Sequence, residues 1–141
     1  MKTKTHTFTS LFAIVCASFL LAGCAGMKTS TTTVTERDNG RDVQVAVGHV
    51  LVVKLPGNAT TGYRWTASKT ATESILQQLG DSTYAPDMAP PGMVGVGGTE
   101  TFQFEARKAG QETLRLEYVR SWEKGVPPAR TFAVNVTVTE K

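Results

Sequence analysis

Apolar and polar side chains alternate along several segments of this chain, and this period of two constrains the fold more than any other feature. In the segment 99–106, Phe102, Phe104 and Ala106 fall on one face, and Leu114 and Leu116 do the same in the segment 113–122. Successive side chains of a β-strand point to opposite faces, so such alternation predicts strands with one buried face. We therefore expect a core enclosed by β-sheets.

Strands of this kind recur at near-regular spacing from residue 43 onward. We predict them over residues 43–47, 50–55, 63–67, 81–84, 99–106, 113–122 and 131–139, with glycine, proline or asparagine between most of them. About seven short strands with such turns are typical of an all-β fold, a small antiparallel immunoglobulin-like β-sandwich. The segment Ala71–Leu79 fits either a helical turn or a strand.

The first 23 residues have the pattern of an export signal. Lys2 and Lys4 precede an apolar run over residues 11–21, which is too short to span a membrane as a helix. Cys24 directly follows Leu-Ala-Gly, which resembles the lipobox of bacterial lipoproteins, where this cysteine becomes the acylated first residue. The alternative is an ordinary signal peptide followed by an incidental cysteine.

This interpretation divides the chain into three parts. Residues 1–23 are a lipoprotein signal peptide, 24–39 a flexible tether with lipidated Cys24, and 40–141 the β-sandwich domain. The tether is predicted because residues 27–39 are rich in threonine and charge and hold one large aliphatic side chain, Val34. Acylation would anchor the protein in the bacterial cell envelope. Ala25 is not the aspartate that retains lipoproteins at the inner membrane, so the outer membrane is expected.

Residues suited to catalysis or metal binding are scarce. Of the two histidines, only His49 lies outside the signal segment. Of the two cysteines, only Cys24 lies outside it. A Ser-His-Asp catalytic triad, a Cys-His catalytic dyad and a His/Cys metal site are therefore not expected, and neither is a cofactor. The acidic residues of the strands are expected to face solvent (Glu100, Glu105, Glu112 and Glu117). The chain is predicted not to be an enzyme.

The charge balance also argues against nucleic acid as a partner. Loss of Lys2 and Lys4 with the signal segment lowers the number of basic residues from 15 to 13, against 12 acidic residues. A nucleic-acid surface would need clustered lysine and arginine, which this chain lacks.

Three long connections are expected to meet at one end of the sandwich. When consecutive strands run antiparallel, alternate connections lie at the same end. The connections over residues 56–62, 85–98 and 121–130 therefore converge, provided that Ala71–Leu79 does not reverse the chain direction. Loops clustered on a rigid scaffold are a common site of recognition.

Each of these connections carries a compact motif. The first holds Asn-Ala-Thr-Thr-Gly-Tyr over residues 58–63, the second Gly-Val-Gly-Gly over 95–98, and the third Arg-Ser-Trp over 120–122. In this order they resemble the chagasin family of cysteine-protease inhibitors, whose pattern is Asn-Pro-Thr-Thr-Gly-Tyr or Phe, then Gly-x-Gly-Gly, then Arg-Pro-Trp. The resemblance extends from about Val43 to Val138. Ala59 and Ser121 stand where the family has proline.

The resemblance implies a reversible inhibitor that blocks the active-site cleft of papain-like cysteine proteases with these three loops. Thr60 and Thr61 would enter the cleft, while Asn58 braces their loop through an Asx-type hydrogen bond and Gly62 adopts a positive φ. The predicted protease-binding residues are Asn58, Ala59, Thr60, Thr61, Gly62, Tyr63, Gly95, Val96, Gly97, Gly98, Arg120 and Trp122.

The two other motifs are given roles of their own. Gly97 and Gly98 lack side chains, so a protease backbone could approach and pair with theirs. Trp122 is expected to be the energetic anchor beside Arg120, with a core tryptophan as the alternative, the role expected for Trp65.

A second interpretation keeps the fold and changes the function. An immunoglobulin-like sandwich also serves in non-inhibitory adhesion or assembly modules, because fold alone does not settle function. Such a module would not need a tryptophan beside glycine-rich loops. In both interpretations we expect a monomer, and a membrane as partner through acylated Cys24.

Overall fold

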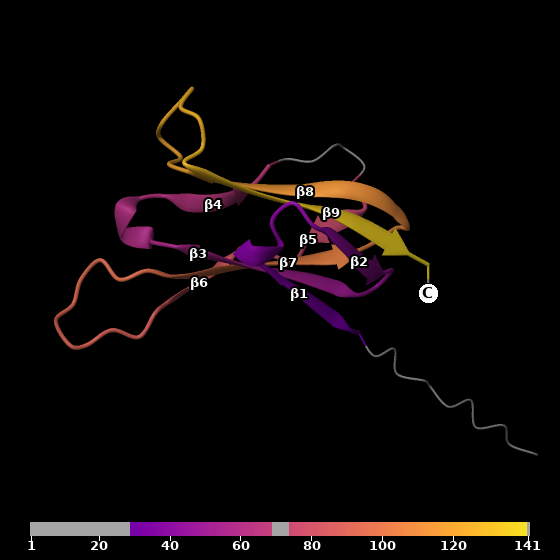
Figure 1. Cartoon of the computed structure of the whole chain (residues 1–141), viewed down its shortest axis with the longest axis horizontal. Helices are drawn as coiled ribbons and strands as arrows, with labels where there is room; N and C mark the ends of the chain where they lie inside the picture. Colours follow the sequence, from indigo (N-terminus) through magenta and orange to yellow (C-terminus); the bar gives the residue numbers. More distant parts are fainter. Residues whose placement is uncertain (1–28, 69–73, 141) are drawn as a thin grey trace, which may run out of the picture.

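The computed structural model describes residues 29–68 and 74–140, and these form two β-sheets packed face to face (Figure 1). The strands are β1 (Thr31–Thr35), β2 (Asp42–Ala46), β3 (Val50–Gly57), β4 (Arg64–Ala67), β5 (Leu76–Gln78), β6 (Thr83–Pro86), β7 (Gly98–Ala106), β8 (Gly110–Val119) and β9 (Arg130–Thr139). Two short 3-10 turns, Glu36–Asp38 and Ala59–Thr61, are the helical elements of the described ranges. No helix within those ranges is long and apolar enough to cross a membrane.

One sheet has the strand order β1-β3-β7-β5, and β6 also pairs with β7, on the same edge as β5 but nearer the start of β7. The other sheet has the order β2-β9-β8-β4. The expected β-sandwich is thus confirmed, although two pairings, β1 with β3 and β2 with β9, are parallel. The alternation in the sequence correctly identified the inward faces of β7, β8 and β9. Within the ambiguous segment Ala71–Leu79, Leu76–Gln78 form a strand, and residues 71–73 lie outside the described ranges.

The predicted start of the domain at residue 40 is wrong. Thr31–Thr35 form β1, which pairs with Val50–Lys54 of β3, and the Val34 side chain is 3% exposed in the core. Threonine has a high β propensity, so a threonine-rich run with one inward valine can complete a sheet edge. Residues 31–38 therefore belong to the folded domain rather than to a tether. Cys24 and the signal segment lie outside the described residues.

Shortening the chain tests this boundary. A chain that begins at Gly40 should unfold at a lower temperature than one that begins at Thr29, because it loses β1 and the buried Val34 side chain. Burial of a valine contributes about 1.5–3 kcal/mol, and the lost strand pairing adds to this. Thermal unfolding followed by circular dichroism measures the difference. Equal unfolding midpoints would restore the tether interpretation.

The expectation that Glu100 faces solvent is also wrong, because its side chain faces the core. It lies on the same face of β7 as Phe102, and only 4% of its side chain is exposed. Its carboxylate accepts hydrogen bonds from the backbone N–H of Trp65 at 3.0 Å and from the Ser82 hydroxyl at 2.8 Å. Because Trp65 lies on β4 of the other sheet, Glu100 links the two sheets close to the end where the three loops lie. Glu105, Glu112 and Glu117 are partly exposed.

Candidate functional site

Three loops meet at one end of the sandwich, at the left of Figure 1. We define the first loop as residues 58–63 between β3 and β4, the second as 87–97 between β6 and β7, and the third as 120–129 between β8 and β9. Hydrogen bonds connect the first loop to both of the others. The convergence predicted from strand direction is therefore present.

The first loop is a tight turn organised by Asn58. Its side-chain oxygen accepts hydrogen bonds from the Thr60 N–H at 3.0 Å and the Thr60 hydroxyl at 2.6 Å. The Thr61 hydroxyl donates to the Asn58 carbonyl at 2.6 Å, and Gly62 ends the turn with φ of 77°. The expected Asx-type bond and positive φ are both present. The turn therefore exposes Thr60 and Thr61 on a backbone that is already ordered.

The second loop is tied to the first and is largely apolar. The Asn58 side-chain amide donates to the Gly95 carbonyl at 2.8 Å, and the Asp87 N–H donates to the Gly97 carbonyl at 2.9 Å at the base of the loop. Large apolar side chains are exposed along this loop and were not predicted as site residues, although their position in a proline- and glycine-rich connection was a signal. They are Met88, Met93 and Val94.

Gly98 does not have the role predicted for it. It is buried in β7 between Gly57 of β3 and Pro86 of β6, so both edges of its backbone face strands of this chain. A Cβ atom at Gly98 would lie 2.4 Å from the Ala85 carbonyl oxygen. The missing side chain thus serves the packing of the domain. Gly97 is half-buried and would carry a Cβ atom at ordinary contact distances, 3.5 Å from its nearest neighbours.

Trp122 is the most prominent aromatic side chain of the site. It is 63% exposed and lies over Gly62, where a Cβ atom would come within 2.3 Å of the indole ring. Glycine at position 62 therefore allows both the positive φ and the close approach of Trp122. Trp65 is 4% exposed and belongs to the core, so the two tryptophans have the separate positions expected of them.

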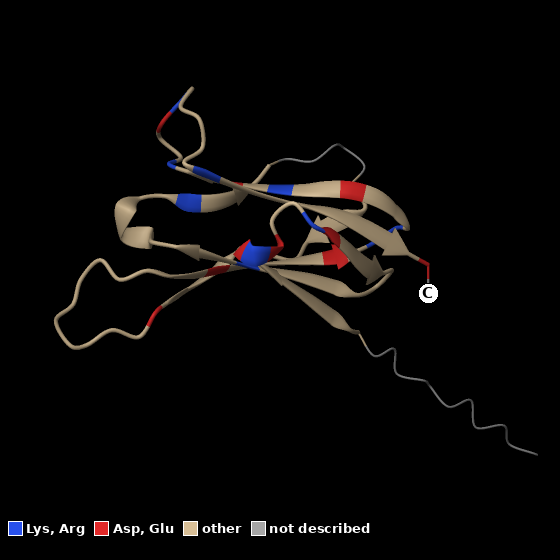
Figure 2. Ribbon diagram, in the orientation of Figure 1, with Lys and Arg blue, Asp and Glu red and all other residues tan. Residues whose placement is uncertain are grey.

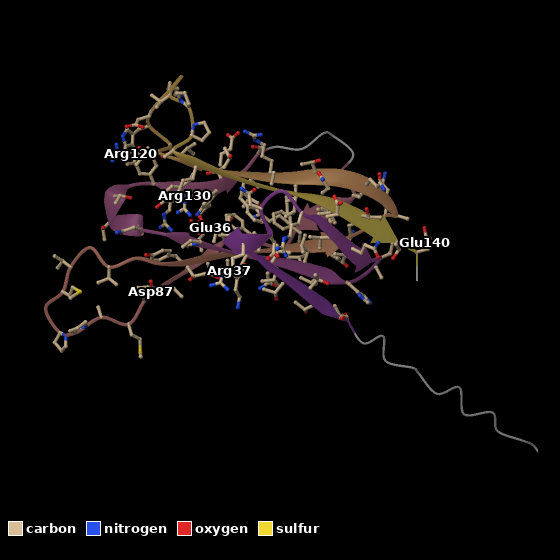
Figure 3. All side chains as sticks on the ribbon, viewed as in Figure 1. Glu36, Arg37, Asp87, Arg120, Arg130 and Glu140 are labelled. Carbon is tan, nitrogen blue, oxygen red and sulfur yellow. The ribbon has the colours of Figure 1, made fainter. Side chains whose placement is uncertain are left out.

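Arg120 turns toward the first loop. Its Nε–H donates to the Thr61 carbonyl at 3.1 Å, and its guanidinium lies 4.3 Å from the centre of the Tyr63 ring. Nη1 also pairs with Glu123 at 3.0 Å, and this hydrogen bond raises the pKa of Arg120. Arg120 and Tyr63 therefore support the loops that carry Thr61 and Trp122. Figure 3 shows Arg120 at the base of the third loop, above the first.

The exposed tips of the first two loops carry no charge. No charged residue occurs in the segments 56–63 and 88–98, and Figure 2 shows the tips of both connections without blue or red. Asp87, labelled in Figure 3, lies at the base of the second connection. Uncharged tips lose little hydration energy on entering a cleft, whereas burial of an unpaired charge is strongly unfavourable. Among the described residues, no cluster of His, Cys, Asp and Glu could hold a metal ion.

A sandwich that presents three interlinked, exposed loops at one end has the architecture of a binding protein. The family model described as Chagasin family peptidase inhibitor I42 matches residues 44–136. The chain therefore belongs to the chagasin family of peptidase inhibitors and is not an enzyme, as the loop motifs and the scarcity of catalytic residues predicted.

Individual relatives agree with this assignment. Chagasin of Trypanosoma cruzi is 33% identical over 104 residues, which cover 72% of this chain and 92% of chagasin. Amoebiasin-2 of Entamoeba histolytica is 29% identical over 128 residues, covering 90% of this chain and 94% of the relative. Among solved structures, the cysteine protease inhibitor EhICP2 of Entamoeba histolytica superposes with a TM-score of 0.64 at 25% identity, covering 81% of this chain and all of EhICP2.

Proposed function

We propose that this protein inhibits papain-like cysteine proteases reversibly, by placing its three loops in the active-site cleft. The observation that carries the proposal is the exposed Thr60-Thr61 turn, with exposed Trp122 packed against Gly62 of the same loop and the apolar second loop hydrogen-bonded to Asn58. EhICP2, a structural relative with 25% identity, is described as a cysteine protease inhibitor. A turn with apolar neighbours suits a cleft whose reactive groups lie at its floor.

The chemistry of the target explains the composition of the first loop. Papain-like enzymes keep a cysteine thiolate beside a protonated histidine. The hydroxyl groups of Thr60 and Thr61 each donate one hydrogen bond within the loop, and the Thr61 hydroxyl oxygen also accepts one from the Tyr63 N–H at 3.5 Å. Each oxygen therefore keeps at least one lone pair for donors of the protease. The turn is closed by hydrogen bonds from Thr61 N–H to the Asn58 carbonyl and from Gly62 N–H to the Ala59 carbonyl. A closed turn does not present an extended peptide for attack, so binding proceeds without cleavage.

Titration of papain with the chain that begins at Ala25 tests this proposal. A fluorogenic peptide reports residual protease activity, and gel electrophoresis of the same mixture reports whether the inhibitor stays intact. Reversible inhibition with an uncut chain is expected. A folded chain that leaves papain fully active at micromolar concentration would refute the proposal and favour an adhesion or assembly module.

We also propose that Cys24 anchors the protein in the bacterial envelope, at the outer membrane, after removal of residues 1–23. Six residues lie between Cys24 and Thr31, so the start of β1 can stand at most about 25 Å from the lipid attachment. Thr31 pairs with Val50 at the beginning of β3, whereas the first loop follows the end of β3. This arrangement directs the three loops away from the membrane.

The anchor predicts a specific labelling result. Cys24→Ser should abolish incorporation of labelled palmitate in a bacterial host, because the acylated thiol is lost. The matched control is Cys16→Ser, which lies within the signal segment and should leave incorporation unchanged. Palmitate incorporation by the Cys24→Ser chain would contradict the lipoprotein assignment.

A further inference from the structure

One buried side chain, that of Tyr118, supports the first loop, which is hydrogen-bonded in turn to the other two loops. Tyr118 lies near the end of β8, is 7% exposed, and is paired in register with Trp65 of β4 and Arg130 of β9. In the sequence it only continues the alternation of Leu114 and Leu116 along its strand. Its surroundings give it a more specific place, directly beneath the first loop.

The Tyr118 hydroxyl fixes the point where the first loop begins. It accepts a hydrogen bond from the Asn58 N–H at 2.8 Å, and the Asn58 carbonyl lies 3.4 Å from the same oxygen. Asn58 in turn organises the turn through Thr60 and holds the second loop through Gly95. The position of Asn58 therefore sets the position of two loops at once.

The Tyr118 ring supports the contact between the first and third loops. It stacks on Tyr63 with a centroid distance of 5.2 Å, and Tyr63 carries the Arg120 guanidinium on its ring. Arg130 lies 5.8 Å from the centre of the Tyr118 ring, donates to the Pro56 carbonyl and pairs with Glu36 (Figure 3). Stacked aromatic rings and guanidinium groups of this kind hold one another in fixed orientations.

We propose that Tyr118 is a positioning residue for protease binding, which orders the first loop before the protease arrives. This inference rests on the proposed function, because it assigns Tyr118 an effect on affinity through Asn58. A proline fixes φ and lowers the entropy lost on binding. In this chain the hydrogen bond from the Asn58 N–H to the buried Tyr118 hydroxyl restricts the backbone at the start of the loop.

The variant Tyr118→Phe removes the hydroxyl and keeps the ring. It should weaken inhibition of papain about tenfold, since the Asn58 N–H loses its partner. Hydrogen exchange of the free chain should become faster at the amides of Thr60, Thr61 and Gly62, which are bonded within the turn. Tyr84→Phe is the matched control, because Tyr84 lies at the same end of the sandwich but contacts Gly98, and it should change neither quantity.

Restoring the proline distinguishes positioning from a general loss of packing. Ala59 occupies the first position of the 3-10 turn, and Asn58 before it is extended at φ of −139° and ψ of 103°, which are the conditions that proline prefers. The double variant Tyr118→Phe/Ala59→Pro should recover both the affinity and the slow exchange, which a merely destabilised core would not do.

Each outcome decides the proposal. Unchanged exchange and affinity in Tyr118→Phe, or a loss that Ala59→Pro does not recover, would overturn it. If the unmodified chain fails to inhibit papain, the proposed function is refuted. The exchange rates of the free chain then still decide whether Tyr118 orders the first loop.

Discussion

Trp122→Ala is expected to weaken inhibition of papain roughly 100-fold while the domain stays folded. Tryptophan and arginine are enriched among the few residues that dominate protein interfaces, and truncating such a residue typically weakens the binding free energy by about 2–4 kcal/mol. Trp122 is 63% exposed in the free chain, so most of its surface is available to a partner. Inhibition constants measured with a fluorogenic substrate give the loss, and circular dichroism reports the fold.

Val126→Ala provides the control for this prediction. Val126 lies in the same loop and is 55% exposed, but it has no part in the contact between Trp122 and Gly62. It should change inhibition by less than about threefold, as expected outside the few residues that dominate an interface. Equal effects of the two variants, or none from either, would remove Trp122 from its role as anchor.

Gly98→Ala is expected to destabilise the domain strongly, whereas Gly97→Ala is expected to be tolerated. The new methyl group at Gly98 would lie 2.4 Å from a backbone oxygen and 2.6 Å from the Tyr84 ring, which forces β6 away from β7. Overpacking of this severity lowers the free energy of unfolding by about 3 kcal/mol, which lowers the unfolding midpoint by more than about 10 °C in a domain of this size.

The neighbouring glycine supplies the comparison. At Gly97 the nearest atoms would be 3.5 Å away and φ is not positive, so alanine fits without strain. The reduced entropy of the unfolded chain offsets any small loss, and the midpoint should stay within a few degrees. Thermal unfolding of both variants measures the contrast. Similar midpoints for Gly98→Ala and Gly97→Ala would show that the sheet has room for a side chain at position 98, so that the Gly98 backbone could be open to a partner as predicted from the sequence.

The strands and the convergence of the loops could be predicted because both follow from local patterns. Alternation identifies a strand and its buried face, and the direction of successive strands determines which connections share an end. β1 was missed because threonine-rich sequence with one valine is typical of a linker as well as of an edge strand. Only the pairing with β3, which is distant along the chain, distinguishes the two.

The roles of individual site residues were harder to predict, because they depend on contacts between segments far apart in the sequence. Gly98 was assigned to a partner's backbone, but its neighbours on both sides are strands of its own sheet. Arg120 was assigned to the protease, and nothing in the sequence indicated that it also donates a hydrogen bond to the Thr61 carbonyl of the first loop. Glu100 lies two residues before Phe102 in β7, so the alternation of the strand placed it on the inward face. The general expectation that carboxylates face solvent led to the opposite prediction.

Hydrogen exchange of the chain in complex with papain tests most directly whether the loop end is the inhibitory surface. We predict that the amides of residues 58–63, 95–97 and 120–122 exchange more slowly in the complex, while those of the turns at Gly48 and Gly110, at the opposite end, are unchanged. Slower exchange at the Gly48 and Gly110 turns, with the three loops unaffected, would contradict the proposed mode of inhibition.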